Sequence, residues 1–330
     1  MWVDPDYFCP TFSHNWYSNT NDSKIGNMSA ERRDKLVITG GSGFIGRNLL
    51  DTLRNSPYET ISVSKETSVG GVENVHEDLT KTDFDFLESL DPRFVVYLAT
   101  ISSPKEAALK KQESYDTNVT AVQRFLEKAK DLRIKKIVLL SSVVLYSGDS
   151  DKPYKEDAEL APFRDAYNLS KFFLEGLASY YRQSYGLPIT VFRLSNTYGP
   201  HQTTERVPLL IPKLFEEALN EGRLQVWNTK PIRDWVFVGD VCKVIIRELA
   251  AKGDGIFNLG TGRGRSVREV VEIISSLTGV PYQDLNKPVD PPMRVVCDMA
   301  ALQEHLGYVP DTSLETGLAK TLEFHKARKK

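Results

Sequence analysis

The chain of 330 residues is poor in cysteine. Its three cysteines, Cys9, Cys242 and Cys297, lie far apart and show neither CxxC nor metal-ligand spacing. This pattern excludes a disulfide scaffold and a zinc site built from cysteine pairs, and we expect no metal site. An odd number of cysteines without pairing favours a reducing compartment, so a cytoplasmic protein is predicted.

The chain also lacks a strong net charge and a long apolar run. Its 42 basic and 44 acidic residues give a formal net charge of -2, which argues against nucleic acid or an anionic membrane as a partner. No run approaches the roughly 18 apolar residues that a transmembrane helix needs. The composition, 41% hydrophobic and 26% charged, is that of a globular protein with a sizeable core.

After Lys35, short apolar runs alternate with helical patterns. Strands are predicted at 36–39, 60–64, 72–79, 94–99, 135–142 and 188–195, and helices at 44–56, 118–132, 166–184, 208–221, 266–278 and 313–327. Strands that are apolar on both faces and alternate with helices indicate a parallel sheet covered on both sides. We therefore predict an α/β fold with a Rossmann-type doubly wound sheet.

Domain boundaries follow from where this pattern begins and changes. Residues 1–27 are polar and aromatic without a clear period and lack the features of a signal peptide, so residues 1–33 are expected to be an appendage. The dinucleotide-binding domain is predicted over 34–195, with a return segment at about 233–260 that brings two strands, DWVFV and GIFNLG, back to the main sheet. A smaller α/β domain for substrate is predicted over 196–232 and 261–330.

A glycine-rich loop joins the first predicted strand to the first helix. VITGGSGFIGRNLL places Gly40, Gly43 and Gly46 at GxxGxxG spacing, with Phe44 and Ile45 opening the helix. Glycines at these positions permit a tight turn and a close backbone approach to a pyrophosphate, and the helix N-terminus favours the negative charge. The position between a strand and a helix supports a dinucleotide site over a plain turn.

The end of the second strand bears on the choice of cofactor. A dinucleotide site usually carries an acidic residue there, which binds the ribose 2′-hydroxyl. This strand instead ends in Val63, Ser64 and Lys65. A hydroxyl with a cation suits a 2′-phosphate, so NADP(H) is slightly favoured over NAD(H), although Lys65 could equally be a solvated surface residue. Asp78 and Leu79, after the third strand, are expected beside the adenine.

DAYNLSKFFLEG places Tyr167 and Lys171 four residues apart and so on one helix face. Tyrosine has an ordinary pKa near 10, and a nearby lysine and a cationic nicotinamide would lower it. The phenol could then exchange a proton with a hydroxyl during hydride transfer, with Ser142 bonded to the same oxygen. The spacing alone is common by chance on amphipathic helices.

The order of these motifs resembles the extended short-chain dehydrogenase/reductase family, in its nucleotide-sugar epimerase/dehydratase/reductase branch, from about Leu36 to Leu322. The resemblance implies Ser142, Tyr167 and Lys171 as a catalytic triad. It places the cofactor against the glycine loop, Leu98, Ala99, Thr100 and Asn118. RLSNTYGP, RDWVFVGDV and RVVCD match later family stretches, which implies that Asn196, Arg233 and Arg294 contact the nucleotide-sugar.

Two valines narrow the reaction that this resemblance implies. Sugar 4,6-dehydratases of the family carry Asp and Glu directly after the catalytic hydroxyl residue, and this chain has Val143 and Val144 there. A valine neither gives nor takes a proton, so dehydration is disfavoured and decarboxylation is less expected. C4 epimerisation and net reduction or dehydrogenation at C4 both remain open. WNTKPIRDW lacks the family's Gly-Asp-Gly turn before the arginine, which leaves the sugar undefined.

Two other classes are weighed against the nucleotide-sugar enzyme. A relative that reduces a non-sugar carbonyl would not need Asn196, Arg233 and Arg294, and a non-catalytic cofactor-binding homologue often loses the tyrosine or lysine that this chain keeps. Helices near 113–131 and 166–184 resemble those that the family uses for dimerisation. We therefore expect a homodimer, with internal packing of these helices as the alternative.

Overall fold

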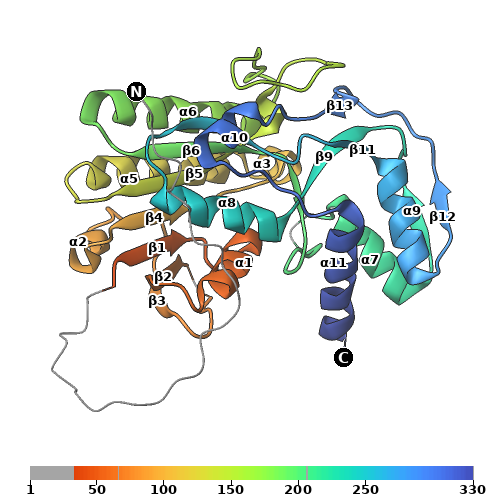
Figure 1. Cartoon of the computed structure of the whole chain (residues 1–330), viewed down its shortest axis with the longest axis horizontal. Helices are drawn as coiled ribbons and strands as arrows, with labels where there is room; N and C mark the ends of the chain where they lie inside the picture. The colour runs from red at the N-terminus through yellow and green to blue at the C-terminus, as the bar shows by residue number, and fades with distance from the viewer. Residues whose placement is uncertain (1–32, 66, 206, 330) are drawn as a thin grey trace, which may run out of the picture. The chain divides into compact units, whose positions relative to one another are not determined.

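The structure is a computed structural model that describes residues 33–65, 67–205 and 207–329. The predicted appendage, apart from Arg33, lies outside the described residues. A parallel sheet of seven strands forms the larger part of the fold, in the order β10-β6-β5-β4-β1-β2-β3 (Figure 1). The strands are β1 (Lys35–Thr39), β2 (Glu59–Ser64), β3 (Glu73–His76), β4 (Phe94–Tyr97), β5 (Lys136–Ser142), β6 (Ile189–Leu194) and β10 (Gly255–Leu259).

The strand order reverses beside β1, which pairs with β2 on one side and β4 on the other. Ligands of open α/β sheets bind outside the carboxyl ends of the strands at such a reversal. The predicted Rossmann-type fold is confirmed. Its helices are α1 (Phe44–Leu53), α2 (Phe86–Leu90), α3 (Pro104–Leu109), α4 (Lys111–Tyr115), a π-helical turn (Asp116–Thr120), α5 (Ala121–Ala129), α6 (Ala166–Tyr185) and α8 (Val238–Ala250).

Successive strand residues face opposite sides of the sheet, and each side has its own core. Leu36 and Ile38 of β1 pack in the core that contains α1 and α8. Val37 of the same strand packs in the other core, with residues of α5 and α6. Apolar residues on both faces of one strand therefore produce the two helical layers that the sequence predicts.

The remaining elements form a second part of the fold beyond the carboxyl ends of the main strands. Helices α7, α9 and α11 gather there, beyond strand β9 (Figure 1). The elements are β7 (Asn196–Tyr198), α7 (Leu210–Glu221), β8 (Leu224–Val226), β9 (Ile232–Phe237), β11 (Gly264–Ser266), α9 (Val267–Thr278), β12 (Tyr282–Asp284), β13 (Arg294–Val295), α10 (Ala300–Leu306) and α11 (Leu314–Lys329).

One predicted strand pairing is wrong. DWVFV was expected to return to the main sheet with GIFNLG, but only GIFNL does so, as β10 beside β6. DWVFV belongs to β9, which pairs with β7, β11 and β13 in the second sheet. The cause is β7, because it follows β6 almost directly and offers β9 a partner away from the main sheet. Of the return segment predicted at about 233–260, α8 and β10 therefore return: β10 joins the main sheet, and α8 packs in the core on one of its faces.

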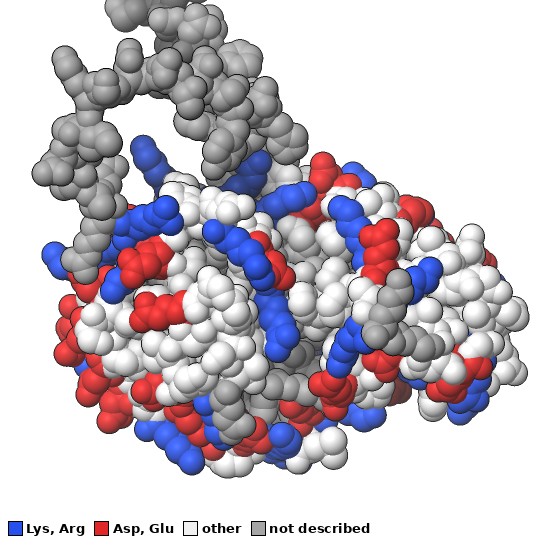
Figure 2. All heavy atoms as spheres, turned by 90° about the horizontal axis from the view of Figure 1, so that it is seen from below, with Lys and Arg blue, Asp and Glu red and all other residues white. Residues whose placement is uncertain are grey.

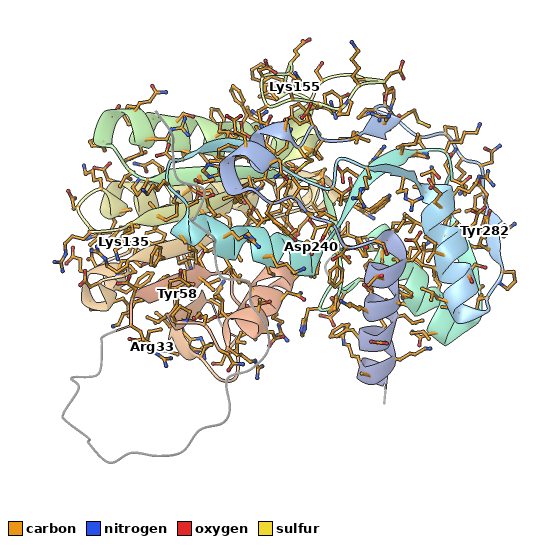
Figure 3. All side chains as sticks on the ribbon, viewed as in Figure 1. Arg33, Tyr58, Lys135, Lys155, Asp240 and Tyr282 are labelled. Carbon is orange, nitrogen blue, oxygen red and sulfur yellow. The ribbon has the colours of Figure 1, made fainter. Side chains whose placement is uncertain are left out.

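A long connection between β5 and α6 crosses towards the second part of the fold. It begins with a short 3-10 turn, Val143–Leu145. Tyr154 then exchanges main-chain hydrogen bonds with residues beside β13, from its N–H to Val296 O and from Asp298 N–H to its own carbonyl, both at 2.8 Å. Lys155 marks this connection in Figure 3, and Asp240 marks the start of α8 beside β9.

The charged surface agrees with the small net charge. On the face drawn in Figure 2, basic and acidic side chains are interspersed over the described residues. Within the described part of the chain, no helix is both long and apolar enough to span a membrane.

Candidate functional site

The glycine loop lies between β1 and α1 and leaves no room for side chains. Gly40 has a φ of +67°, and a Cβ there would lie 2.9 Å from the main-chain nitrogen of Ala99. A Cβ on Gly46 would lie 2.3 Å from the carbonyl oxygen of Gly40. Helix α1 begins after Gly43 without a side-chain cap. Its first N–H groups are thus available to an anion at the strand ends.

One hydrogen bond joins this cofactor-side helix to the loop after β7, and a second, within the helix, holds the donor in place. The amide nitrogen of Asn48 donates to the carbonyl of Pro200 at 2.8 Å and also to that of Phe44 at 2.8 Å. The loop therefore has a fixed position beside the start of α1.

Ser64 and Lys65 lie at the end of β2, as predicted, but both have partners within the chain. The Ser64 hydroxyl donates to the carbonyl of Thr67 at 2.6 Å. The Lys65 ammonium lies 3.4 Å from a carboxylate oxygen of Asp78, which follows β3. Hydrogen bonds from Thr80, together with Lys65, hold the pKa of Asp78 below its ordinary value. Lys65 stays largely exposed, and Leu79 is buried in the core.

The segment after β4 is held tightly against the glycine loop. The N–H of Leu98 donates to the carbonyl of Thr39 at 3.1 Å, and the N–H of Ala99 donates to the Thr39 hydroxyl at 3.2 Å. Asn118 is fully buried within the π-helical turn. Its amide accepts from Thr100 Oγ1 at 2.8 Å and donates to Ser170 Oγ at 3.0 Å. Asn118 therefore fixes Thr100 rather than facing the open cavity.

Ser142, Tyr167 and Lys171 converge where β5 meets α6. Helix α6 begins at Asp165, whose side chain accepts from the N–H of Asn168, and this start directs Tyr167 and Lys171 towards β5. The Lys171 ammonium donates to Thr100 Oγ1 at 3.0 Å and to the carbonyl of Leu140 at 2.9 Å. It lies 5.7 Å from the centre of the Tyr167 ring.

Burial has the largest effect on the pKa values of Tyr167 and Lys171. Burial raises the pKa of Tyr167 to about 12, against a lowering effect of the hydrogen bond with Ser142. Burial also lowers the pKa of Lys171 to about 8. Burial therefore dominates the pKa of Tyr167 in the protein alone, and the expectation that Lys171 and a bound nicotinamide lower this pKa stays a prediction. The phenol is protonated at neutral pH, which suits it to donate a proton.

The two valines after Ser142 have different surroundings. Val143 is buried with Tyr146, Tyr154 and Cys297, so its side chain belongs to the core. Val144 is half-buried and packs against the cluster of Ile101, Ala107 and Tyr167. Of the two valines, only Val144 therefore packs against the cluster that contains Tyr167.

A cavity of about 370 Å³ joins most of the predicted site residues. Of these, it is lined by Gly40, Gly43, Phe44, Ile45, Gly46, Leu98, Thr100, Ser142, Tyr167, Lys171 and Asn196, and the two valines, Val143 and Val144, line it as well. The cavity thus brings the glycine loop, the Ser–Tyr–Lys group and Asn196 to one place. It does not reach Ser64, Lys65, Asp78, Leu79, Ala99, Asn118, Arg233 or Arg294.

Arg233 and Arg294 lie beside each other on β9 and β13, where Val295 pairs with Arg233. The Arg233 guanidinium donates to three carbonyls, those of Ile232, Pro292 and Met293, at 2.8 to 3.0 Å. Burial lowers the pKa of Arg233, and the nearby carboxylate of Asp149 opposes this effect. Asp149 also accepts the N–H of Arg294 at 3.0 Å. Asp149 is therefore an acidic neighbour of both arginines.

Sequence reasoning missed a buried ion pair beneath Ser142. Glu175 accepts two hydrogen bonds from the guanidinium of Arg193, both at 2.9 Å, and one from Ser141 Oγ at 2.6 Å. Arg193 also donates to Tyr146 Oη at 3.1 Å. The signal was present, because Glu175 lies four residues after Lys171 and shares its helix face.

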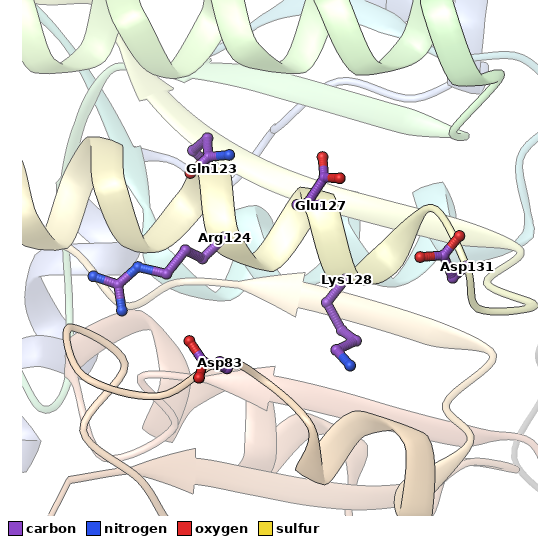
Figure 4. Close-up of a pocket in the computed structure, with 6 residues that line it drawn as sticks. All are labelled: Asp83, Gln123, Arg124, Glu127, Lys128 and Asp131. Carbon is purple, nitrogen blue, oxygen red and sulfur yellow. The ribbon is translucent and has the colours of Figure 1, made fainter.

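A second hollow lies over α5, away from this cavity (Figure 4). It is lined by Asp83, Gln123, Arg124, Glu127, Lys128 and Asp131. Its cations have partners within the chain: Arg124 donates to the carbonyls of Thr80 and Thr82, and Lys128 lies 2.6 Å from Glu88. Among the described residues, no cluster of His, Cys, Asp and Glu could hold a metal ion.

The residues of the main cavity fit a nicotinamide dinucleotide. The backbone at Gly40 and Gly46 carries no side chains and the helix start is uncapped, which suits a pyrophosphate. Tyr167 and Lys171 line the same cavity. Fold and cavity together define a dinucleotide-dependent enzyme of the Rossmann class. The chain belongs to the NAD dependent epimerase/dehydratase family, whose model matches residues 36–260.

Several similar proteins have names that refer to nucleotide-sugars. The UDP-glucose 4-epimerase of Mycolicibacterium smegmatis is 28% identical, over 88% of this chain and 98% of that protein. The dTDP-glucose 4,6-dehydratase of Neisseria meningitidis serogroup B is 28% identical, over 88% of this chain and 93% of its own. The structure of MoeE5 in complex with UDP-glucose and NAD is 26% identical with a TM-score of 0.79, over 90% of this chain and 100% of that one.

Proposed function

We propose that the protein transfers hydride at C4 of a nucleotide-activated sugar, as a 4-keto sugar reductase or dehydrogenase or as a C4 epimerase. The observation that carries this proposal is the shared cavity of the glycine loop, the Ser–Tyr–Lys group and Asn196. The family and the activities named for its relatives support the substrate class. A bound nicotinamide cofactor would supply or accept the hydride.

In this proposal Tyr167 is the acid and base at the C4 oxygen. Ser142 bonds the same oxygen, and the Lys171 ammonium, fixed by Thr100 and Leu140, provides positive charge beside the ring. In the reductase direction the protonated phenol of Tyr167 donates to the keto oxygen, although the pKa that burial raises makes it a weaker acid in the protein alone. Lys171 stabilises the phenolate that remains.

The second part of the fold is proposed to hold the nucleotide. This assigns 196–232 and 261–330 to the nucleotide-sugar, with residues 34–195 and the return segment for the cofactor. Arg233 and Arg294 are proposed partners for the diphosphate, since guanidinium groups match phosphate oxygens well. Asn196 lines the cavity between the two parts and is proposed to contact the sugar or its diphosphate.

For the cofactor, we propose a narrow preference for NADP(H) over NAD(H). The exposed ammonium of Lys65 is available to a 2′-phosphate, while Asp78 partly neutralises it. The similar protein MoeE5 forms a complex with NAD, so both cofactors are expected to bind to this protein. Dissociation constants for NADP(H) and NAD(H) test this: the Lys65→Ala variant should weaken NADP(H) alone. A tenfold preference of the parent protein for NAD(H) would remove the proposal.

The reaction is tested with UDP-, GDP-, dTDP- and CDP-sugars and their 4-keto derivatives, with and without added cofactor, followed by NMR. Turnover with no net change of cofactor identifies an epimerase, and stoichiometric consumption identifies a reductase or dehydrogenase. Formation of a 4-keto-6-deoxy product from a sugar that carries a 6-hydroxyl, by loss of water, would contradict the argument from Val143 and Val144. No turnover of any sugar would refute the proposed function.

A homodimer through α6 is also proposed. Four aromatic residues of this helix are each between 38% and 53% exposed to solvent: Phe172, Phe173, Tyr180 and Tyr185. Aromatic side chains on one helix are enriched at interfaces between subunits. Light scattering should give twice the mass of the chain, and a monomer mass would contradict this. The cytoplasmic location stays a prediction from cysteine content.

A further inference from the structure

The wall of the cavity next to Tyr167 is formed by Val144. Its main chain is fixed at both ends: its N–H donates to Ser142 Oγ at 3.4 Å, and its carbonyl accepts from the Asn168 amide at 2.9 Å. Its side chain packs on the cluster that contains Tyr167. An apolar surface therefore lies directly beside the hydroxyl groups that are proposed to hold the reacting oxygen.

The position of this wall limits the neighbours of the reacting carbon. This inference rests on the proposed function, in which C4 of the sugar lies against Tyr167. The two carbons next to C4 are C3 and C5. The group on C3 is a hydroxyl or an amide in most sugars and needs a polar partner, whereas the group on C5 varies. Val144 offers neither a donor nor an acceptor, so it suits the C5 side. The C5 substituent would then leave water and rest on a methyl surface.

A charged group on C5 would find no free side chain of opposite charge beside Val144 among the described residues of the cavity lining. Lys171 is the one charged side chain of the described cavity lining, and its ammonium already donates to Thr100 and Leu140. A carboxylate on C5 would lie against Val144 with no free cation among the described lining residues to neutralise it, which is unfavourable. A hydroxymethyl group would lose its hydrogen bonds to water, whereas a methyl group loses none.

We propose that the substrate is a 6-deoxy nucleotide-sugar, with a methyl group on C5, rather than a nucleotide-activated uronic acid or a sugar with a free 6-hydroxyl. In the reductase direction, this is a 4-keto-6-deoxy sugar that Tyr167 protonates on the C4 oxygen while hydride adds to C4. In the reverse direction, the corresponding 4-hydroxyl is oxidised.

The test compares three sugars that differ only at C6: 6-deoxyglucose, glucose and glucuronic acid. All three are attached to the same nucleotide, which is the one that the panel described above identifies. The 6-deoxy sugar should exceed glucose in kcat/KM by about tenfold, the order expected for a hydrophobic pocket that meets an added hydroxyl. Glucuronate should fall at least roughly a further tenfold, because its charge is unpaired.

Variants tie the selectivity to the wall. Val144→Thr keeps the shape of the side chain but replaces one methyl group with a hydroxyl. It should reduce the ratio of kcat/KM for the 6-deoxy sugar to kcat/KM for glucose at least about threefold. Val75→Thr, at a half-buried valine of β3 outside the cavity, is the matched control and should leave the ratio unchanged. An unchanged ratio in Val144→Thr would overturn the inference.

The outcomes separate this inference from the proposed function. Turnover that favours glucose or glucuronate over the 6-deoxy sugar would overturn the inference and leave hydride transfer at a nucleotide-sugar intact. Absence of turnover across the whole panel would remove the proposed function itself. A preference for the 6-deoxy sugar that shrinks in Val144→Thr alone would support both.

Discussion

The buried pair of Glu175 and Arg193 should contribute strongly to stability. The side chains are 6% and 5% exposed, and two parallel hydrogen bonds of 2.9 Å join them. In Glu175→Gln the shape is kept, but the guanidinium loses its counter-charge and one amide N–H group faces an N–H donor. Breaking a buried pair from one side costs about 3–5 kcal/mol. The free energy of unfolding should fall by that amount.

Urea unfolding followed by circular dichroism measures this change, and the thermal midpoint should fall by roughly 5–8 °C in a protein of this size. The control is Glu113→Gln, at an exposed pair with Lys110 whose side chains are 56% and 52% exposed. It should lose less than about 1 kcal/mol. The double variant Glu175→Leu with Arg193→Met should recover part of the loss, because it leaves no unpaired charge. Equal losses in Glu175→Gln and Glu113→Gln would refute the reasoning.

Three further predictions concern the site. Tyr167→Phe should reduce turnover at least about a hundredfold, the usual scale of lost acid–base catalysis, while cofactor affinity measured by fluorescence stays within a factor of about two; normal turnover would exclude Tyr167 as the acid. Burial lowers the pKa of Lys171 to about 8 from its ordinary 10.5, so between these values the unfolded chain binds more protons and this residue's contribution to stability rises with pH. The stability of Lys171→Met relative to the parent should therefore fall from pH 8 to pH 10, and a flat difference would contradict the lowered pKa. Asp149→Asn keeps an acceptor for Arg294 but removes charge beside the arginine pair, so UDP should bind about two- to fivefold more tightly by calorimetry, a change typical of about 0.5–1 kcal/mol. Asp151→Asn, on the same exposed connection, is the control, and equal effects in both variants would point to net charge alone.

Local patterns predicted most of the fold and the centre of the site. The glycine loop requires a strand, a turn and a helix in succession, and Tyr167 and Lys171 share a helix face through their spacing alone. Both features depend on neighbours in sequence, and the structure has them as expected. The strand pattern similarly identified the main sheet, because apolar residues on both faces of a strand indicate burial between two layers.

Features that depend on distant partners were not predictable in this way. The pairing of Lys65 with Asp78 arises because β3 ends beside β2, which a reading of one strand does not reveal. The partner of β9 was wrong for a similar reason, since β7 is too short to stand out as a strand. The raised pKa of Tyr167 reflects complete burial, and the sequence showed only the nearby lysine. Whether Asn196, Arg233 and Arg294 bind substrate remains a prediction.

The crowding of the glycine loop has a consequence for redesign of the enzyme. A Cβ on Gly46 would lie 2.6 Å from Cα of Gly41 as well as against Gly40, and Gly40 itself abuts Ala99. A side chain at Gly40 or Gly46 would therefore distort the main chain, so neither position can be used to retune cofactor choice. The exposed Lys65 and its neighbour Asp78 are free of that constraint. Directed libraries that aim to exchange one nicotinamide coenzyme for the other should therefore leave the turn untouched and vary these two positions.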